Sequence, residues 1–198
     1  MNMIATLLRK VGRKLSGSRS SKRTSRGMLS GTLKWVGENG IDVSVTPSRP
    51  VLFLPCSGAK ASGTLPAIEK YTGSSVWGLL KKCPERFATL QIKVQIVIVS
   101  AQYGVLYPHE PVDDYDVTMT HQQAAKITNI HQREKLSRIL KDAGSGTIYL
   151  ALPMAYRNFV EDLVPSLNQN DNVRRFAPGS GIGRQRQQIN HWMNKLIS

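Results

Sequence analysis

"IKVQIVIVSA" (residues 92–101) is the stretch that decides the fold, because it contains four consecutive apolar residues and is rich in β-branched ones. Strands that are buried on both faces of a parallel sheet have continuous apolar runs of this kind, whereas half-exposed strands alternate. Two further stretches share this character, "PVLFLPC" (50–56) and "TIYLALP" (147–153). Together they predict the buried strands of a parallel sheet.

The segments between and after these strands predict helices. We expect a helix in two pieces over 65–82, one or two helices over 119–144, a helix over 155–167 and a final helix over 181–197, with an edge strand at 172–178. A short helix within 27–42 is expected to end at Gly37 or Gly40, before a weak strand at 43–47. This alternation predicts an α/β fold, with a mainly parallel sheet flanked by helices, in a single domain with a basic N-terminal extension.

The extension comprises residues 1–31 and is expected to be a basic amphipathic arm followed by a flexible linker, ahead of an α/β domain over 32–198. The first acidic residue of the chain is Glu38. Three interpretations stay open: an arm that binds nucleic-acid phosphates, a mitochondrial transit peptide, and a helix that lies on a membrane surface. In the first, the phosphate-binding residues are Arg9, Lys10, Arg13, Lys14, Arg19, Lys22, Arg23 and Arg26.

The net charge points to a polyanionic partner. The 198 residues include 27 Lys and Arg against 13 Asp and Glu, a formal charge of +14, which favours nucleic acid or an anionic membrane surface. No apolar stretch is long enough to span a bilayer. Cys56 and Cys83 form neither a disulfide framework nor a zinc spacing, so we expect a cytoplasmic protein, or a mitochondrial one if residues 1–31 are a transit peptide.

Three segments follow predicted strands, where open α/β sheets form their sites: "PCSGAK" (55–60), "SAQYGVLYPHEPVDDYD" (100–116) and "LPMAY" (152–156). The first, "PCSGAK" (55–60), supplies Cys56, Ser57, turn amides and Lys60, which together could hold an anion. It lacks the spacing of a phosphate-binding P-loop. A plain turn from strand to helix, with Cys56 as a small buried hydrophobe, explains the same residues.

The second segment, 100–116, gathers four of the 13 acidic residues among several aromatic ones. Carboxylates so close together are expected to raise the pKa of at least one of them, which separates an acid from a base. Aromatic rings among them could stack on a nucleobase. The alternative is a structural loop whose Asp side chains accept hydrogen bonds from backbone amides.

A further candidate segment precedes the last helix. "APGSGIGRQRQ" (177–187) places glycines and Arg184 where the free amides of a helix N-terminus could bind an anion. A glycine-rich entry into a terminal helix is also common for geometric reasons alone. Gly181, Gly183 and Arg184 are the candidate anion-binding residues here.

Two of the quoted patterns resemble a known family. "YTGSSVWGLL" (71–80) followed by "IVIVSAQYGVLYPHEPVDDYDVTM" (96–119) resembles the YaaA superfamily, and "LPCSGAK" (54–60) is similar to uncharacterised, often phage-encoded domains and to the core of archaeosine synthase. The resemblance covers roughly residues 50–190. It implies a nucleobase or nucleic acid at the strand ends, because YaaA is associated with DNA binding and oxidative-stress protection and archaeosine synthase modifies a deazaguanine base in tRNA. The matching positions are Ser100, Tyr103, Gly104, Leu106, Pro108, Tyr115 and Met119.

The charge, the segments and the resemblance together suggest an enzyme that modifies a base in nucleic acid, or cuts or exchanges the base–sugar bond, with DNA favoured over RNA. The expected catalytic residues are Asp114 or Asp116 as the carboxylate, Lys60 as an anchor or amine nucleophile, and Tyr103 as a stacking ring. The expected substrate-binding residues are Cys56, Ser57, Ser100, Gly104, Tyr115, Gly181, Gly183 and Arg184. No cofactor and no metal are expected.

Two other functions stay open at this point. One is a non-catalytic DNA-binding protein for stress protection or phage takeover of a host, in which the acidic segment is structural. In it, the basic arm and Arg174, Arg175, Arg184 and Arg186 provide the affinity. The other is an enzyme on free nucleotides that has acquired a targeting arm.

Overall fold

The computed structural model describes residues 33–36, 42–45, 48–73, 75–176 and 182–197. The chain divides into two units, 1–46 and 47–198, and each is described by itself. The predicted arm (1–31) and Gly181 lie outside the described residues.

The first unit contains a β-hairpin. Strand β1 (Leu33–Val36) pairs antiparallel with β2 (Asp42–Val45), with Leu33 opposite Val45. The prediction of a helix within 27–42 is therefore wrong for 33–36, whereas β2 confirms the weak strand. Four residues between glycine-containing segments are too few to nucleate a stable helix, and pairing with a second strand satisfies their backbone groups instead.

The second unit contains a five-stranded sheet in the order β6-β5-β3-β8-β9. Its central strand β3 (Val51–Pro55) is parallel to β5 (Gln95–Ser100) and to β8 (Ile148–Leu150), and β9 (Val173–Arg175) lies at one edge. At the other edge β6 (Gly104–Leu106) turns back antiparallel to β5. A small separate pair joins β4 (Leu65–Pro66) to β7 (Pro111–Val112). The predicted α/β fold with a mainly parallel sheet is confirmed.

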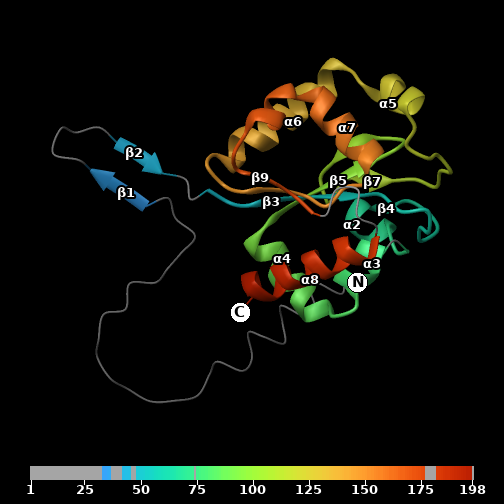
Figure 1. Cartoon of the computed structure of the whole chain (residues 1–198), viewed down its shortest axis with the longest axis horizontal. Coiled ribbons are helices and arrows are strands. Elements are labelled where there is room, and N and C mark those ends of the chain that lie inside the picture. The colour runs from blue at the N-terminus through green and yellow to red at the C-terminus, as the bar shows by residue number, and fades with distance from the viewer. Residues whose placement is uncertain (1–32, 37–41, 46–47, 74, 177–181, 198) are drawn as a thin grey trace, which may run out of the picture. The chain divides into compact units, whose positions relative to one another are not determined.

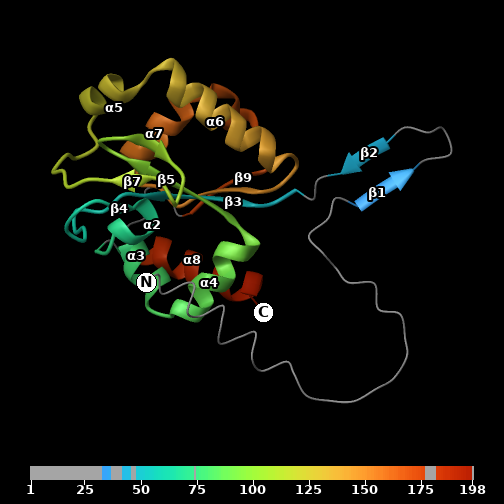
Figure 2. The same ribbon diagram turned by 180° about the vertical axis from the view of Figure 1, so that it is seen from behind.

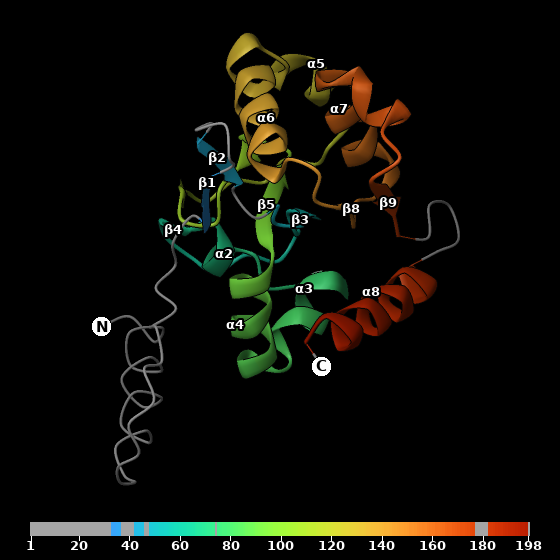
Figure 3. The same ribbon diagram turned by 90° about the vertical axis from the view of Figure 1, so that its left-hand side faces the viewer.

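Helices cover both faces of this sheet (Figures 1, 2 and 3). On one face lie α2 (Ala67–Lys70), α3 (Ser75–Lys81), α4 (Pro84–Lys93) and α8 (Ile182–Ile197). On the other lie α5 (His121–Ile127), α6 (Ile130–Ala143) and α7 (Met154–Leu163), and a 3₁₀ turn (Pro165–Gln169) follows α7. None of the described helices is long and apolar enough to cross a membrane.

Helix α4 was missing from the sequence expectations, which assigned residues 92–94 to the strand. Pro84 occupies the first turn of α4, where a proline needs no amide partner. The helix continues to Lys93, and the strand begins only at Gln95. The side chain of Ile92 is accordingly 73% exposed rather than buried in the sheet.

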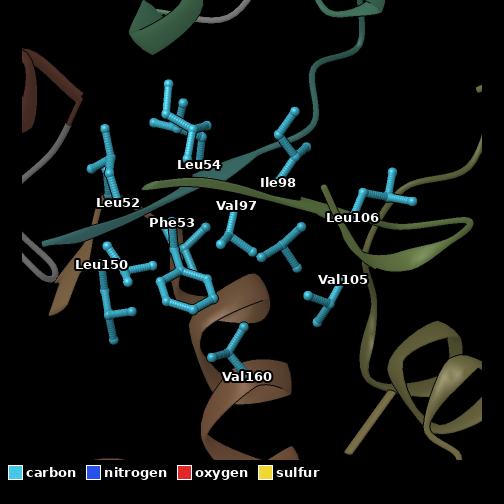
Figure 4. Packing of buried hydrophobic residues seen from close by; sticks show 14 of the residues in the cluster. Leu52, Phe53, Leu54, Val97, Ile98, Val105, Leu106, Leu150 and Val160 are labelled. Carbon is cyan, nitrogen blue, oxygen red and sulfur yellow. The ribbon is translucent and has the colours of Figure 1, made fainter. Parts of the chain in front are cut away.

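The core explains why the central strands have continuous apolar runs. Phe53 and Val97 point from neighbouring strands toward Val160 of α7, whereas Leu52 and Ile98 point to the opposite face (Figure 4). Every residue of β3 is buried, so neither face of the strand tolerates a polar side chain. The faces of the central strand are therefore filled by the core, and a site is to be sought at the strand ends.

Gly104, where β6 begins, has a φ of +72°, which a side chain disfavours. A Cβ there would lie 2.5 Å from Oε1 of Gln132, which accepts a hydrogen bond from the Val105 amide, while Nε2 donates to the Tyr103 carbonyl. We expect Gly104→Ala to lower the free energy of unfolding by about 2 kcal/mol, from backbone strain and displaced hydrogen bonds. Urea unfolding measures this loss.

Gly78→Ala is the matched control, because a Cβ at Gly78 in α3 meets no atom within 4 Å. Alanine favours helix over glycine by up to about 1 kcal/mol, so this variant should be neutral or more stable. Equal effects of the two substitutions would contradict the role assigned to Gly104.

Candidate functional site

The carboxyl end of β3 is the point in the sheet where connections diverge. The chain leaves β3 toward the face covered by α2, α3 and α4, but leaves its neighbour β8 toward the face where α7 lies (Figures 1 and 2), while its other neighbour, β5, turns back as β6 within the sheet. In open α/β sheets such a switch point leaves a crevice outside the strand ends, where ligands bind. The segments that follow the three strands begin at Cys56, Ala101 and Ala151.

Four of the six tyrosines of the chain gather at this end of the sheet, and we call Tyr71, Tyr103, Tyr115 and Tyr156 the tyrosine cluster. The Tyr115 hydroxyl lies 2.9 Å from the Tyr71 hydroxyl and 2.9 Å from Oγ of Ser100. The ring of Tyr103 meets that of Tyr115 edge-on, with centroids 5.5 Å apart. This network fixes the position of the Tyr115 ring.

Tyr156, the fourth member of the cluster, contacts the segment that follows β3. The Tyr156 hydroxyl lies 3.2 Å from Sγ of Cys56, which connects the segment after β8 to the segment after β3. Ser57 is buried, and its hydroxyl donates to the Ala59 carbonyl. Cys56 and Ser57 therefore help to shape the turn.

Burial is the main cause that raises the pKa of the Tyr71, Tyr115 and Tyr156 phenols above the ordinary value of 10.0. These phenols consequently remain protonated at neutral pH. They can donate and accept hydrogen bonds but are not phenolate bases. A ligand at the cluster would meet neutral hydroxyl groups.

Lys60 lies over the tyrosine cluster. Its Nζ is 4.3 Å from the centroid of the Tyr115 ring and donates to the Gly58 carbonyl at 3.3 Å. An antiparallel β-bridge between Lys60 and Tyr71 holds the backbone of this turn against the segment before α3. The ammonium group and the fixed aromatic ring form a compact pair that suits an anionic or electron-rich planar ligand.

Gly73 allows this close approach of two backbones. A Cβ at Gly73 would overlap the Cβ of Ala59, and the Gly73 amide donates to Oγ of Ser57 at 3.4 Å. Glycine is the residue that fits where one backbone passes so close to another. Any side chain at position 73 would push on the turn that carries Lys60.

Asp114 is held by a buried lysine. Its carboxylate accepts from Nζ of Lys70 at 2.5 Å and from the Gly63 amide at 3.0 Å, and Lys70 also donates to the Gly63 carbonyl at 2.5 Å. The Lys70 side chain is fully buried, whereas that of Asp114 is 65% exposed. This Lys70–Asp114 ion pair fastens the segment before Tyr115 to the turn at Gly63.

The hydrogen bond from Lys70 is the largest cause that lowers the pKa of Asp114 below 3.8, followed by the hydrogen bond from Gly63, with the charge of Lys60 a smaller contribution. Asp114 is therefore not a carboxylate whose pKa is raised by its acidic neighbours. Two other carboxylates of the segment also have their own partners: Glu110 pairs with Lys135, and Asp113 accepts from Thr64. Asp114 is an ionised carboxylate at neutral pH.

A carboxyl group whose pKa is lower in the folded than in the unfolded protein stabilises the fold. This contribution is complete at pH values above the pKa of the unfolded state, and it is lost as the pH falls through the pKa of the folded state. We expect the difference in melting temperature between wild type and Asp114→Asn to stay constant from about pH 7 to about pH 5 and to shrink below about pH 4. Thermal unfolding over this pH range measures it. A difference that vanishes near neutral pH would contradict the ion pair.

The structure brings together most of the residues proposed from the sequence. Asp116 is exposed and, within the described part of the chain, forms no hydrogen bond or ion pair. Gly183 and Arg184 are exposed in the first turn of α8, and no contact among the described residues joins them to the tyrosine cluster. The residues that meet at or beside the carboxyl end of β3 are Cys56, Ser57, Lys60, Ser100, Tyr103, Gly104, Asp114 and Tyr115.

Sequence reasoning missed Lys70, Tyr71, Gly73 and Tyr156. Tyr71 and Gly73 belong to the quoted "YTG" stretch, and Tyr156 to "LPMAY", so their segments were noticed but not their roles. Lys70 carried no signal, because nothing in a sequence indicates that one lysine among many is buried. Among the described residues no three His, Cys, Asp or Glu side chains come together as metal ligands.

The fold and the site together define an α/β protein with a cluster of tyrosines at the carboxyl end of the central strand of a mainly parallel sheet. Residues 51–193, from β3 into α8, match a family of unknown function, DUF6884, and the chain belongs to that family. None of the curated proteins matches the chain.

Proposed function

We propose that this protein is an enzyme that acts on a base in nucleic acid, DNA in preference to RNA, by cutting or exchanging the bond between base and sugar. The observation that carries the proposal is the position of Lys60 over the fixed ring of Tyr115, beside the ionised Asp114. An ammonium group, an aromatic ring and a carboxylate are the groups that this chemistry needs in one place.

The aromatic rings suit an extruded base. Enzymes that act on a base within a nucleic acid take it out of the stack and hold it against aromatic side chains. Tyr103 is half-buried and meets Tyr115 edge-on, so it offers a ring at the mouth of the cluster. The Lys60 ammonium would anchor a carbonyl oxygen of the base or an adjoining phosphate.

The carboxylate would act on the sugar. The bond between C1′ and the base nitrogen breaks, its electron pair leaves with the base, and the base takes up a proton. Asp114, which its low pKa keeps ionised, would stabilise the positive charge that develops on the sugar. Water then adds to C1′ and releases a proton in hydrolysis, or a second base adds its nitrogen and releases a proton in exchange, so that the proton taken up by the leaving base is balanced.

Further features agree with a nucleic-acid substrate in a reducing compartment. The formal charge of +14 favours a polyanion, and the resemblance to the YaaA superfamily implies a nucleobase or nucleic acid at the same strand ends. Cys56 and Cys83 are both free thiols, which suits the cytoplasm.

Mass spectrometry of nucleosides and free bases tests the proposal. Purified protein is incubated with plain DNA, hypermodified DNA and tRNA, and we expect released or altered base from at least one substrate. Substrate incubated without protein is the control. No altered base across the three substrates, from a folded protein, would contradict the enzyme.

Asp116→Asn is the comparison for the carboxylate. Asp116 is exposed and lacks the contacts of Asp114 with Lys70 and Gly63, so we expect this variant to keep activity while Asp114→Asn loses it. Retained activity would remove Asp116 from the catalytic candidates. Full activity in both variants would contradict a carboxylate mechanism.

One observation favours a second function, a nucleic-acid-binding protein without catalysis. Glu110, Asp113 and Asp114 all make contacts that stabilise their segment, as a purely structural loop would. The two functions differ in the phenotype of the Asp114→Asn variant. In an enzyme it still binds nucleic acid but stops turning over, whereas in a binding protein no variant changes a base.

A further inference from the structure

An open hollow of about 640 Å³ lies over α8, away from the tyrosine cluster. The residues that line it are Phe176, Gln187, Gln188, Asn190, His191, Trp192 and Asn194. Most of them come from successive turns of α8, and Phe176 follows β9 at the edge of the sheet. The hollow therefore lies between the last helix and the edge of the sheet.

Three aromatic rings meet on this side of α8. The ring centroid of Trp192 lies 4.6 Å from that of Tyr149 and 5.6 Å from that of Phe176, and Tyr149 and Phe176 stack at 5.7 Å with their planes 15° apart. These contacts hold the indole in place, while Trp192 remains partly exposed toward the hollow. A fixed and accessible indole is a stacking platform for another planar ring.

Side chains with hydrogen-bonding groups surround the indole. Gln187 and His191 are exposed on neighbouring turns of α8, and Asn194 accepts a hydrogen bond from Arg86. Amide and imidazole groups can bind the edges of a base whose pairing partner is absent. A base inside a duplex is stacked on both sides and could not enter the hollow.

The charge around the hollow suits phosphates. Residues 172–197 include five Lys and Arg but no Asp or Glu. Arg184 and Arg186 are exposed in the first turns of α8, the helix that lines the hollow. A strand that placed one base in the hollow would thus meet positive charge along its backbone.

We propose that the hollow over α8 binds one nucleotide of a single-stranded nucleic acid, with the base stacked on Trp192 and the flanking phosphates near Arg184 and Arg186. The proposal shares only the nucleic-acid partner with the proposed function. Mass spectrometry tests the base chemistry, whereas binding measurements test this site. One proposal can therefore be wrong while the other is right.

The test compares two fluorescein-labelled strands, a short oligo-dT and an abasic strand with the same number of phosphates, by fluorescence anisotropy with the full chain. Phosphate contacts made elsewhere in the chain contribute equally to both strands and cancel in the ratio. We expect wild type to bind oligo-dT about 10-fold more tightly than the abasic strand. Trp192→Leu should markedly reduce this preference and leave the affinity for the abasic strand unchanged.

Two further variants keep the test decisive if Trp192→Leu unfolds. The double variant Gln187→Ala/His191→Ala changes only exposed side chains and should reduce the preference, whereas His131→Ala on α6, at the opposite face of the sheet, should not. The double variant Arg184→Ala/Arg186→Ala should bind both strands more weakly, by the same factor. The control Arg138→Ala on α6 should leave both affinities unchanged. The proposal is overturned if wild type does not prefer oligo-dT over the abasic strand. It is also overturned if the folded variants Trp192→Leu and Gln187→Ala/His191→Ala both retain that preference.

Discussion

Lys60→Met is expected to lower the rate of base release about 100-fold or more, with little change in melting temperature. In the folded protein Lys60 makes a long hydrogen bond to Gly58 and a contact with the Tyr115 ring, so its loss costs little stability. A preorganised charge at the reacting base contributes far more to the transition state than to the fold. Initial rates of base release and a thermal melt measure the two effects.

Lys82→Met is the matched control, because Lys82 is an exposed lysine outside the tyrosine cluster and its loss should leave the rate unchanged. Lys60→Arg keeps the charge but changes its shape, so we expect it to recover part of the rate. A Lys60→Met variant with more than about half of the wild-type rate would contradict an anchor at this position.

Asp114→Asn is expected to lower the melting temperature by several degrees and to abolish turnover. The substitution leaves the fully buried ammonium of Lys70 with the Gly63 carbonyl and no carboxylate. A buried charge without its counter-charge is far more costly than an exposed one. Loss of activity in this variant alone could therefore follow from either a catalytic or a structural role.

The double variant Lys70→Met/Asp114→Asn separates these roles. Methionine fills the buried space of the lysine chain without a charge, so we expect most of the lost melting temperature to return. Turnover should stay absent, because the carboxylate is still missing. If turnover returned with stability, Asp114 would be structural, and the carboxylate role proposed for it in the enzyme would be wrong. Lys70→Met alone should be less destabilised than Asp114→Asn, since the Asp114 it leaves is exposed.

The strands and most helices could be predicted because their signals are local. Continuous apolar runs identify β3, β5 and β8, and Gly144, with a φ of +55°, ends α6 as expected. The signals failed where pairing partners decide the structure. Residues 33–36 form a strand only because a second strand pairs with them, and β6 depends on an antiparallel return along β5.

The candidate site was predicted in its segments but not in its contacts. Lys60, Ser100 and Tyr115 could be selected because they follow apolar strands, and the carboxyl ends of parallel strands lie at one edge of a sheet. The partners of Asp114 could not be predicted, because Lys70 is 44 residues away in the sequence and becomes buried only when the chain packs. An acidic stretch therefore looked like coupled carboxylates, although three of its members each have a separate partner.

The sequence by itself determined the fold class, the positive charge and the edge of the sheet where the candidate site lies, because hydrophobic runs and charges depend only on the order of the residues. Only the tertiary structure decided which tyrosines contact one another, that Asp114 forms an ion pair with Lys70, and that the Trp192 ring packs against Tyr149 and Phe176. These contacts join residues far apart in the chain. Their energies depend on distance, orientation and burial, and those quantities exist only once the sheet and helices have packed.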